Sequence, residues 1–265
     1  MFIADLKRAF RLPRWPGLLL LCALTLIFSA DKVPEIVQWG FDRESRMFTD
    51  GAVDSFVYAL MFERFKIVLM LLLMSLFTAV FCHDTKSRFI RMALTRCGLK
   101  KYVVSMFLAD ISAILITVLA AVFLYTFFFV SLGYRLVSAD AAGLYYSELI
   151  LERPVLFLVM ASLVLGMHAA ACSSIGILFS AYRQNAFVSI GIGALVFYLA
   201  LFLTPMNSIF SVLKMTAMDC CLPGGDDVPF AVMFCWSIAF PACICTLCGF
   251  LFYRRTKRRV DDGEL

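Results

Sequence analysis

Long apolar segments restrict the possible folds of this chain more than any other feature of its sequence. Six segments are almost free of charged residues over about the 20 residues that an α-helix needs to cross a bilayer. Of the 265 residues, 62% are apolar or aromatic and 16% are charged, whereas soluble domains are about half apolar and about a quarter charged. Barrel strands alternate polar and apolar residues, and these segments do not. We therefore predict an all-α integral membrane protein, with residues 1–265 forming a single transmembrane domain.

The apolar segments predict six transmembrane helices. The first is short for a complete crossing, and the third is long enough to require a tilt or an extension beyond the bilayer. A cleaved signal peptide is the alternative to the first span, but the large side chain of Phe28 disfavours a cleavage site after Ala30. The predicted spans are Trp15–Ala30, Phe65–Cys82, Val103–Leu132, Val155–Phe179, Ala186–Leu203 and Val228–Tyr253.

The distribution of Lys and Arg predicts the orientation of these spans. Most of them lie before the first span, between spans two and three, and after the last span. Because basic loops stay on the cytosolic side of a membrane, we expect both termini in the cytosol and residues 254–265 to form a cytosolic tail. Because its basic residues are distributed in this way, the net charge of +5 is not a nucleic-acid signal, and no nucleic-acid partner is expected.

The first residues have the pattern of an amphipathic helix. Apolar side chains recur every four residues from Phe2 to Phe10, and charged residues such as Asp5 and Arg8 fall on the opposite face. Such a helix lies in the membrane interface, and two prolines then change the direction of the chain. We predict an elbow helix over residues 1–13, with a solvated basic tail as the alternative.

The segment between spans two and three predicts a short basic helix over residues 84–98. Asp84 suits the N-cap position, and Gly98 suits the left-handed position that follows a helix. An apolar stripe that begins at Phe89 occupies one face of the helix, and basic residues lie around the rest. The helix can therefore bind anionic lipid or dock into a groove of a soluble partner. Both uses remain open at this point. If the helix docks onto a partner, the remaining residues of the docking face are Arg88, Arg91, Met92 and Arg96.

We call the segment between spans two and three the joint. Together with the elbow helix and the six spans, it resembles the permease subunits of ATP-binding-cassette exporters, the type-2 permease family. Members commonly carry an acidic residue after span two, an aromatic or Ile residue before a base, then a Leu, a Gly and basic residues leading to a Tyr. The chain departs from the family at Lys101, where members often carry Arg, and at Met106, where they often carry Lys. The matching residues are Asp84, Phe89, Ile90, Arg91, Leu94, Gly98, Lys100, Lys101 and Tyr102.

The resemblance implies that residues 84–98 form a coupling helix. The coupling helix would sit in a cleft of a separate ATPase subunit. The permease itself would lie in the cytoplasmic membrane of a bacterium. ATP and Mg²⁺ would bind that partner, because the chain has no phosphate-binding loop of its own. A second permease copy or a sister permease would complete the translocation pathway, and the chain itself would not be an enzyme.

Two ionisable residues fall inside predicted spans. Asp110 either lines a polar path, pairs with a base at the membrane face, or is a first-turn carboxylate favoured by the helix dipole. His168 is either a neutral imidazole bonded to a neighbouring helix or a part of a proton or substrate path. A proton-coupled secondary transporter that uses both residues is therefore one alternative function. A membrane scaffold or sensor that binds a cytosolic protein without transport is another.

Small residues in span four predict close helix packing. Gly166, Ala170 and Ser174 are spaced by four, which lets two helices approach each other. The ten Cys predict no metal site and no disulfide framework, because most lie in apolar segments. The state of Cys220 and Cys221, in a predicted outer loop, is left open.

Overall fold

The computed structural model describes most of the chain, and every element in the described residues is a helix apart from one isolated bridge between Gly51 and Arg135. The described residues are 2–10, 14–29, 51–61, 63–87, 89–137, 147–203 and 230–262. The helices are α1 (Phe2–Ala9), α2 (Arg14–Ser29), α5 (Ala52–Met61), α6 (Glu63–Ser75), α7 (Val80–Lys86), α8 (Phe89–Cys97), α9 (Leu99–Ser131), α10 (Ser147–Glu152), α11 (Pro154–Ser180), α12 (Ala186–Leu203) and α14 (Phe230–Asp261).

Among the described residues, four stretches are long and apolar enough to cross a membrane. Two shorter apolar helices, Trp15–Ser29 and Ala186–Ala200, accompany them. These helices confirm the prediction of an all-α membrane protein. The four long stretches are Ile67–Lys86, Leu99–Ser131, Pro154–Ser180 and Phe234–Asp261.

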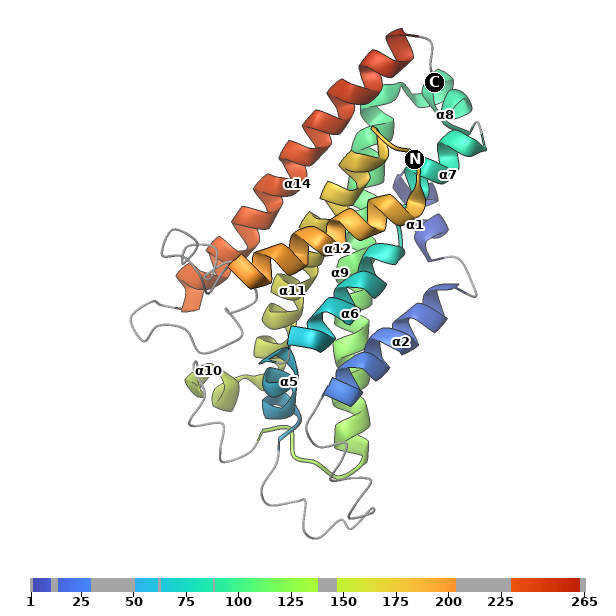
Figure 1. The fold of residues 1–265 in the computed structure, drawn as a ribbon. Coiled ribbons are helices and arrows are strands. Elements are labelled where there is room, and N and C mark those ends of the chain that lie inside the picture. The colour runs from blue at the N-terminus through green and yellow to red at the C-terminus, as the bar shows by residue number, and fades with distance from the viewer. Residues whose placement is uncertain are drawn as a thin grey trace.

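Helices α9 and α11 form the centre of the bundle (Figure 1). Neither Gly nor Pro interrupts the 33 residues of α9, and its apolar residues surround the whole helix, as expected for a helix with neighbours on several sides. Helices α1 and α2 pack against α9, while α12 and α14 pack against α11. Half of the α9 span and 61% of the α11 span are therefore buried among other helices.

The two ends of the bundle differ in their elements. Helices α1, α7 and α8 and the end of α14 lie at one end, whereas α5 and α10 lie at the other (Figure 1). We call the first the basic end, because exposed Arg91, Arg96 and Arg254 lie there. In α5, Val53 and Phe56 are fully buried in the main apolar core. This part of the connection between the first and second predicted spans thus packs into the core of the protein.

The second predicted span is broken between α6 and α7. Residues 76–79 form tight turns, in which the Leu76 amide donates to the Leu73 carbonyl and the Val80 amide to the Phe77 carbonyl. The Thr78 hydroxyl donates to the carbonyl of Met74 over 2.6 Å, a back-bond that commonly bends helices. The span therefore consists of two segments that can pivot relative to each other.

Helix α14 lies at the edge of the bundle, and 22% of its span is buried, against 50–61% of the other three long spans. It continues past the predicted end of span six at Tyr253 as far as Asp261. Most of the predicted tail is thus a continuation of the helix. The Arg259 guanidinium donates to the Ala181 carbonyl over 3.2 Å, which ties this extension to the end of α11.

Helix α11 approaches its neighbours most closely at glycines. A Cβ atom on Gly166 would lie 2.7 Å from a methyl carbon of Leu115 in α9. One on Gly176 would lie 2.5 Å from the Ser189 carbonyl oxygen in α12 and 2.6 Å from a methyl carbon of Thr78. Because backbone atoms cannot move aside as a flexible side chain can, glycine is required at position 176.

We predict that Gly176→Ala destabilises the protein by about 1–3 kcal/mol, because the added methyl group forces α11 and α12 apart. Thermal unfolding in detergent micelles measures this effect. Gly191→Ala in α12 is the matched control, since a Cβ there meets no atom within 4 Å. The control should leave stability unchanged or raise it by up to about 1 kcal/mol. Equal effects of the two variants would contradict the proposed close contact.

Candidate functional site

The joint between the second and third long spans consists of two short helices. Helix α7 ends at Lys86 and α8 begins at Phe89, so the single helix predicted over residues 84–98 is wrong in its first part. Asp84 lies inside α7 and is 1% exposed, so it does not cap the N-terminus of the second helix. The reason is that α7 continues the preceding span past Asp84 before the chain turns. Arg88 lies outside the described residues.

Helix α8 has one buried and one exposed side. Ile90 and Ala93 are 2% and 5% exposed and belong to an apolar cluster at the basic end. Arg91 and Arg96 are exposed, and so is Met92 at 55%. The structure thus places these three predicted docking residues together on the outer side of the joint.

The change of direction from α8 to α9 depends on Gly98. Its backbone has φ 74° and ψ 153°, a region that is essentially restricted to glycine. The positive φ agrees with the prediction for this position, although ψ lies outside the left-handed helical region. The Gly98 amide donates to the Leu94 carbonyl over 3.0 Å and so completes the end of α8.

A cluster of charged and polar side chains holds the joint to the bundle. Both carboxylate oxygens of Asp84 accept hydrogen bonds from the Arg8 guanidinium in α1, one of them over 3.2 Å. The Tyr102 hydroxyl in α9 donates to the Asp84 carboxylate over 2.9 Å. The bond to Asp84 raises the pKa of the Arg8 guanidinium. We call Arg8, Asp84 and Tyr102 the clamp, because they connect α1, α7 and α9.

Two further contacts reinforce the clamp. The Ser105 hydroxyl in α9 donates to the buried Asp5 carboxylate in α1. The Arg8 guanidinium also lies 4.9 Å from the centre of the Phe89 ring in α8, a cation–π geometry. The alternative prediction, a solvated basic tail, is therefore wrong for Arg8, and Asp5 is buried as well. Both side chains face the bundle, while Phe2 and Ile3 are exposed.

Sequence reasoning missed the partner of Asp84. The signal was present, because Asp84 is the only acidic residue in the basic segment between residues 64 and 109. A lone acidic residue at the end of a span requires a basic partner if it is buried. The partner lies 76 residues earlier in the sequence, however, so it is revealed only by the packing of α1.

Asp110 lies in a second polar cluster, deep within the bundle. The residue is fully buried in α9, and its Oδ1 atom accepts a hydrogen bond from the Ser173 hydroxyl in α11 over 3.0 Å. The Ser173 hydroxyl also lies 2.7 Å from that of Thr78, at the break between α6 and α7. The Oδ2 atom has no hydrogen-bond partner among the described residues. Asp110 is therefore not a first-turn carboxylate, because α9 begins at Leu99, and it forms no salt bridge with a base among the described residues.

His168 does not join this cluster. Its Nδ1–H donates to the Val164 carbonyl of its own helix over 2.9 Å, so the predicted bond to a neighbouring helix is absent from the described structure. The Nε2 atom is buried and lacks a partner among the described residues. No hydrogen bond or ion pair therefore connects His168 to Asp110 within the described part of the chain.

The other predicted residues have the following places. Gly166, Ala170 and Ser174 are all buried on α11, and the close approach of Gly166 is to α9 of the same chain. The described Cys residues are free thiols, and no group of three or more His, Cys, Asp or Glu in the described residues could hold a metal ion. Cys220 and Cys221 lie outside the described residues.

Comparisons with known proteins identify no relative of the chain. No family model matches it, and neither a curated protein nor a solved structure matches it. The similarity to type-2 permeases thus stays a prediction from the sequence.

We predict that Arg8→Ala destabilises the protein by about 3–5 kcal/mol, because it leaves a buried Asp84 carboxylate without its counter-charge. Thermal unfolding in detergent measures the loss. The double variant Arg8→Ala with Asp84→Asn should recover most of it, since the unpaired charge is removed as well. Lys7→Ala, at the adjacent exposed position, is the control and should change stability by less than about 0.5 kcal/mol. If the double variant lost as much stability as the two single variants together, the result would contradict the clamp.

We predict that Ser173→Ala destabilises the protein by about 1–3 kcal/mol, because the buried Asp110 carboxyl loses its hydrogen-bond donor. The control is Ser162→Ala on the same helix, where the buried hydroxyl donates to the Leu158 carbonyl of its own helix. That variant should lower the free energy of unfolding by less, since the Leu158 carbonyl retains its helical hydrogen bond. Equal unfolding temperatures of the two variants would argue against the cluster.

Proposed function

We propose that this chain is the membrane-spanning permease subunit of an ATP-driven exporter. A separate ATPase subunit would bind ATP and Mg²⁺ and act on the joint formed by α7 and α8. Two permease chains, either two copies or this chain and a sister permease, would enclose the translocation pathway. The single observation that carries the proposal is the clamped joint, which exposes a basic surface while being fixed to the transmembrane helices.

The proposal includes six spans, with α2 and α12 crossing the membrane beside the four longer stretches. Their 16 and 18 residues extend about 24 and 27 Å at the rise of an α-helix, slightly less than the hydrocarbon thickness of about 30 Å. Local thinning of the bilayer accommodates such short spans. An even number of spans is supported by α1 and the end of α14, which lie at the same end of the bundle (Figure 1). The basic residues at that end support its placement on the cytosolic side of the membrane.

The clamp supplies a mechanical route from the joint to the spans. A force on the outer side of α8 would reach α1 through Phe89 and Arg8, and α7 through Arg8 and Asp84. Tyr102 would pass it to the start of α9. The break at residues 76–79 would let α7 turn relative to α6. Asp84 and Tyr102, two of the residues on which the family resemblance depends, are bonded to each other, which supports a shared role.

The exposed side of α8 indicates the chemistry of its partner. Arg91 and Arg96 would favour an acidic surface, and Met92 between them is a flexible apolar side chain that adapts to a groove. An apolar cleft with an acidic rim on an ATPase subunit matches these features. Anionic lipid alone would attract the two arginines but would not require the rigid clamp behind them.

The polar cluster around Asp110 favours proton-coupled transport as a second candidate function. Thr78, Ser173 and Asp110 form a chain of contacts that ends at the Met74 carbonyl. These three contacts need three hydrogens, and the two hydroxyls supply only two. A proton on the Asp110 carboxyl would complete the chain by reversing the first bond: the carboxyl would donate to the Ser173 hydroxyl, which would then donate to Thr78. Asp110 is therefore a candidate proton-binding group.

We predict that Arg91→Glu with Arg96→Glu lowers the stimulation of the partner ATPase at least tenfold, because two attractive charges become repulsive. The complex is purified from the native host, and the subunit that carries a phosphate-binding loop is identified by mass spectrometry. ATP hydrolysis is then measured in proteoliposomes with and without the permease. The control, Lys257→Glu with Arg258→Glu, makes the same charge change on exposed residues of α14 and should retain the stimulation.

Other outcomes of this experiment would overturn the proposal. A partner ATPase that is bound but moves no solute would indicate a scaffold. Transport that proceeds without ATP and is abolished by Asp110→Asn would indicate a proton-coupled carrier. Unchanged ATPase stimulation in the Arg91 and Arg96 variant would show that α8 is not the coupling element.

A further inference from the structure

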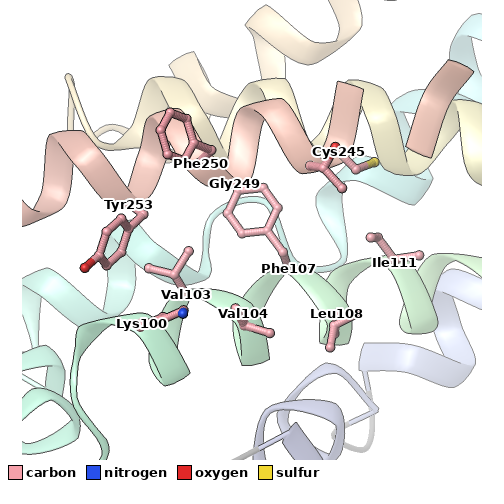
Figure 2. A pocket seen from close by; sticks show the side chains of 11 residues that line it. Lys100, Val103, Val104, Phe107, Leu108, Ile111, Cys245, Gly249, Phe250 and Tyr253 are labelled. Carbon is pink, nitrogen blue, oxygen red and sulfur yellow. The ribbon is translucent and has the colours of Figure 1, made fainter. Parts of the chain in front are cut away.

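A groove between α9 and α14 has the size of a ligand site. Its volume is about 560 Å³, and eleven residues line it, six from α9 and five from α14 (Figure 2). Ligand pockets commonly have volumes of about 300–1,000 Å³. None of these residues belongs to the clamp or is one of the three hydrogen-bonded residues of the cluster around Asp110.

The groove is polar at one end and apolar along the rest of its length. The Lys100 ammonium and the Tyr253 hydroxyl lie at one end, and Ile111 and Cys245 lie at the other (Figure 2). Between these ends the walls are formed by aliphatic side chains and two Phe rings. An amphiphile with one small polar group and a long apolar part fits this distribution.

The charge at the polar end is positive. Lys100 makes no hydrogen bond or ion pair with any described residue, and no acidic residue lines the groove. The Arg254 guanidinium lies 5.6 Å from the centre of the Phe250 ring, which forms part of the groove wall. Lys100 is also the second residue of α9, where the helix dipole adds positive potential. These charges favour an anionic polar group.

The length of the groove matches one leaflet of a bilayer. Lys100 and Ile111 are eleven positions apart on α9, which corresponds to about 16 Å at the rise of an α-helix. One leaflet contributes about 15 Å of hydrocarbon. With Lys100 at the level of the headgroups, Ile111 therefore lies near the middle of the bilayer.

The groove opens sideways towards the surroundings of the bundle. Val104 and Leu108 on one wall are 51% and 49% exposed, and Phe250 on the other is 56% exposed. A Cβ atom at Gly249 would lie 3.9 Å from the Phe107 ring, so the glycine leaves space in the groove. In a membrane, the molecules that reach an apolar surface of this kind are lipids.

We propose that the groove between α9 and α14 binds an anionic phospholipid, with an acyl chain along the groove and the phosphate on Lys100. Arg254 adds a second positive charge beside the headgroup. The proposal requires only that the protein is embedded in a membrane, so it holds or fails independently of the ATP-driven export proposed above. A lipid at this place would fill the gap beside the least buried of the long spans, α14.

Native mass spectrometry of the purified full chain tests the proposal, with phosphatidylglycerol and phosphatidylcholine as the probes. We expect one tightly retained phosphatidylglycerol and a weaker retention of phosphatidylcholine. Lys100→Gln should lower the affinity for phosphatidylglycerol about fivefold and largely remove the preference for the anionic lipid. Lys101→Gln is the matched control, because it removes the same charge from the next, exposed residue, which does not line the groove. Equal effects of the two variants would overturn the proposal.

A covalent label locates the lipid without any substitution. A phosphatidylglycerol with a photoactivatable group in the middle of its acyl chain should label groove residues such as Leu108 and Thr246, as mapped by peptide mass spectrometry. Gly249→Phe, which fills the groove, should abolish this labelling while the protein still elutes as a single folded species. Labelling only outside the groove would overturn the proposal. So would a change from dimer to monomer in Gly249→Phe with lipid retention unchanged, because the groove would then be an interface between two copies.

Discussion

The buried carboxylate of Asp84 is the constraint on which the basic end of the molecule depends. A carboxylate removed from water is stable only if other groups neutralise and bond it. Arg8 and Tyr102 do so from two different helices, and this requirement determines where α1 lies against α9. The short joint is consequently part of the folded bundle, although its outer side is free to contact another molecule.

The bundle separates rigid contacts from places that can move. The glycines of α11 allow backbone contact with α12, and such close packing transmits displacement because there is no space to absorb it. The break at residues 76–79 interrupts one span at the level of the Thr78 and Ser173 hydroxyls. A rotation of α7 would therefore disturb the hydrogen bonds around Asp110. One polar cluster includes Thr78 within this break, and the clamp contains Asp84 on the α7 side of it, which makes coupled rearrangement physically possible.

The sequence predicted those parts of the fold that depend on local patterns. Apolar segments identified α9 and α11, because a helix surrounded by lipid or by other helices has no polar face. The glycine at position 98 identified the turn after α8, because its backbone conformation is accessible to few other residues. The exposed Arg91 and Arg96 followed from the helical spacing of the joint. In each case the decisive information lay within a few residues.

The parts that could not be predicted depend on partners distant in the sequence. The amphipathic pattern of α1 indicated a solvated charged face, yet Arg8 and Asp5 face the bundle because Asp84 and Ser105 lie opposite them. The depth of Asp110 was ambiguous, since its position on α9 did not show which residues of α11 surround it. The groove beside Lys100 was also hidden, because it arises from the relative placement of α9 and α14.

The length of α9 has a consequence for the behaviour of the protein in different membranes. Exposed apolar side chains extend along this helix from Val104 to Val130, which is about 39 Å at the rise of an α-helix. The hydrocarbon layer is about 30 Å thick, so the helix must cross at a slant or stretch the lipids around it. A thicker bilayer would allow α9 to stand more upright and would carry the attached α8 along the plane of the membrane surface. Membrane thickness thereby becomes a variable that sets the position of the joint.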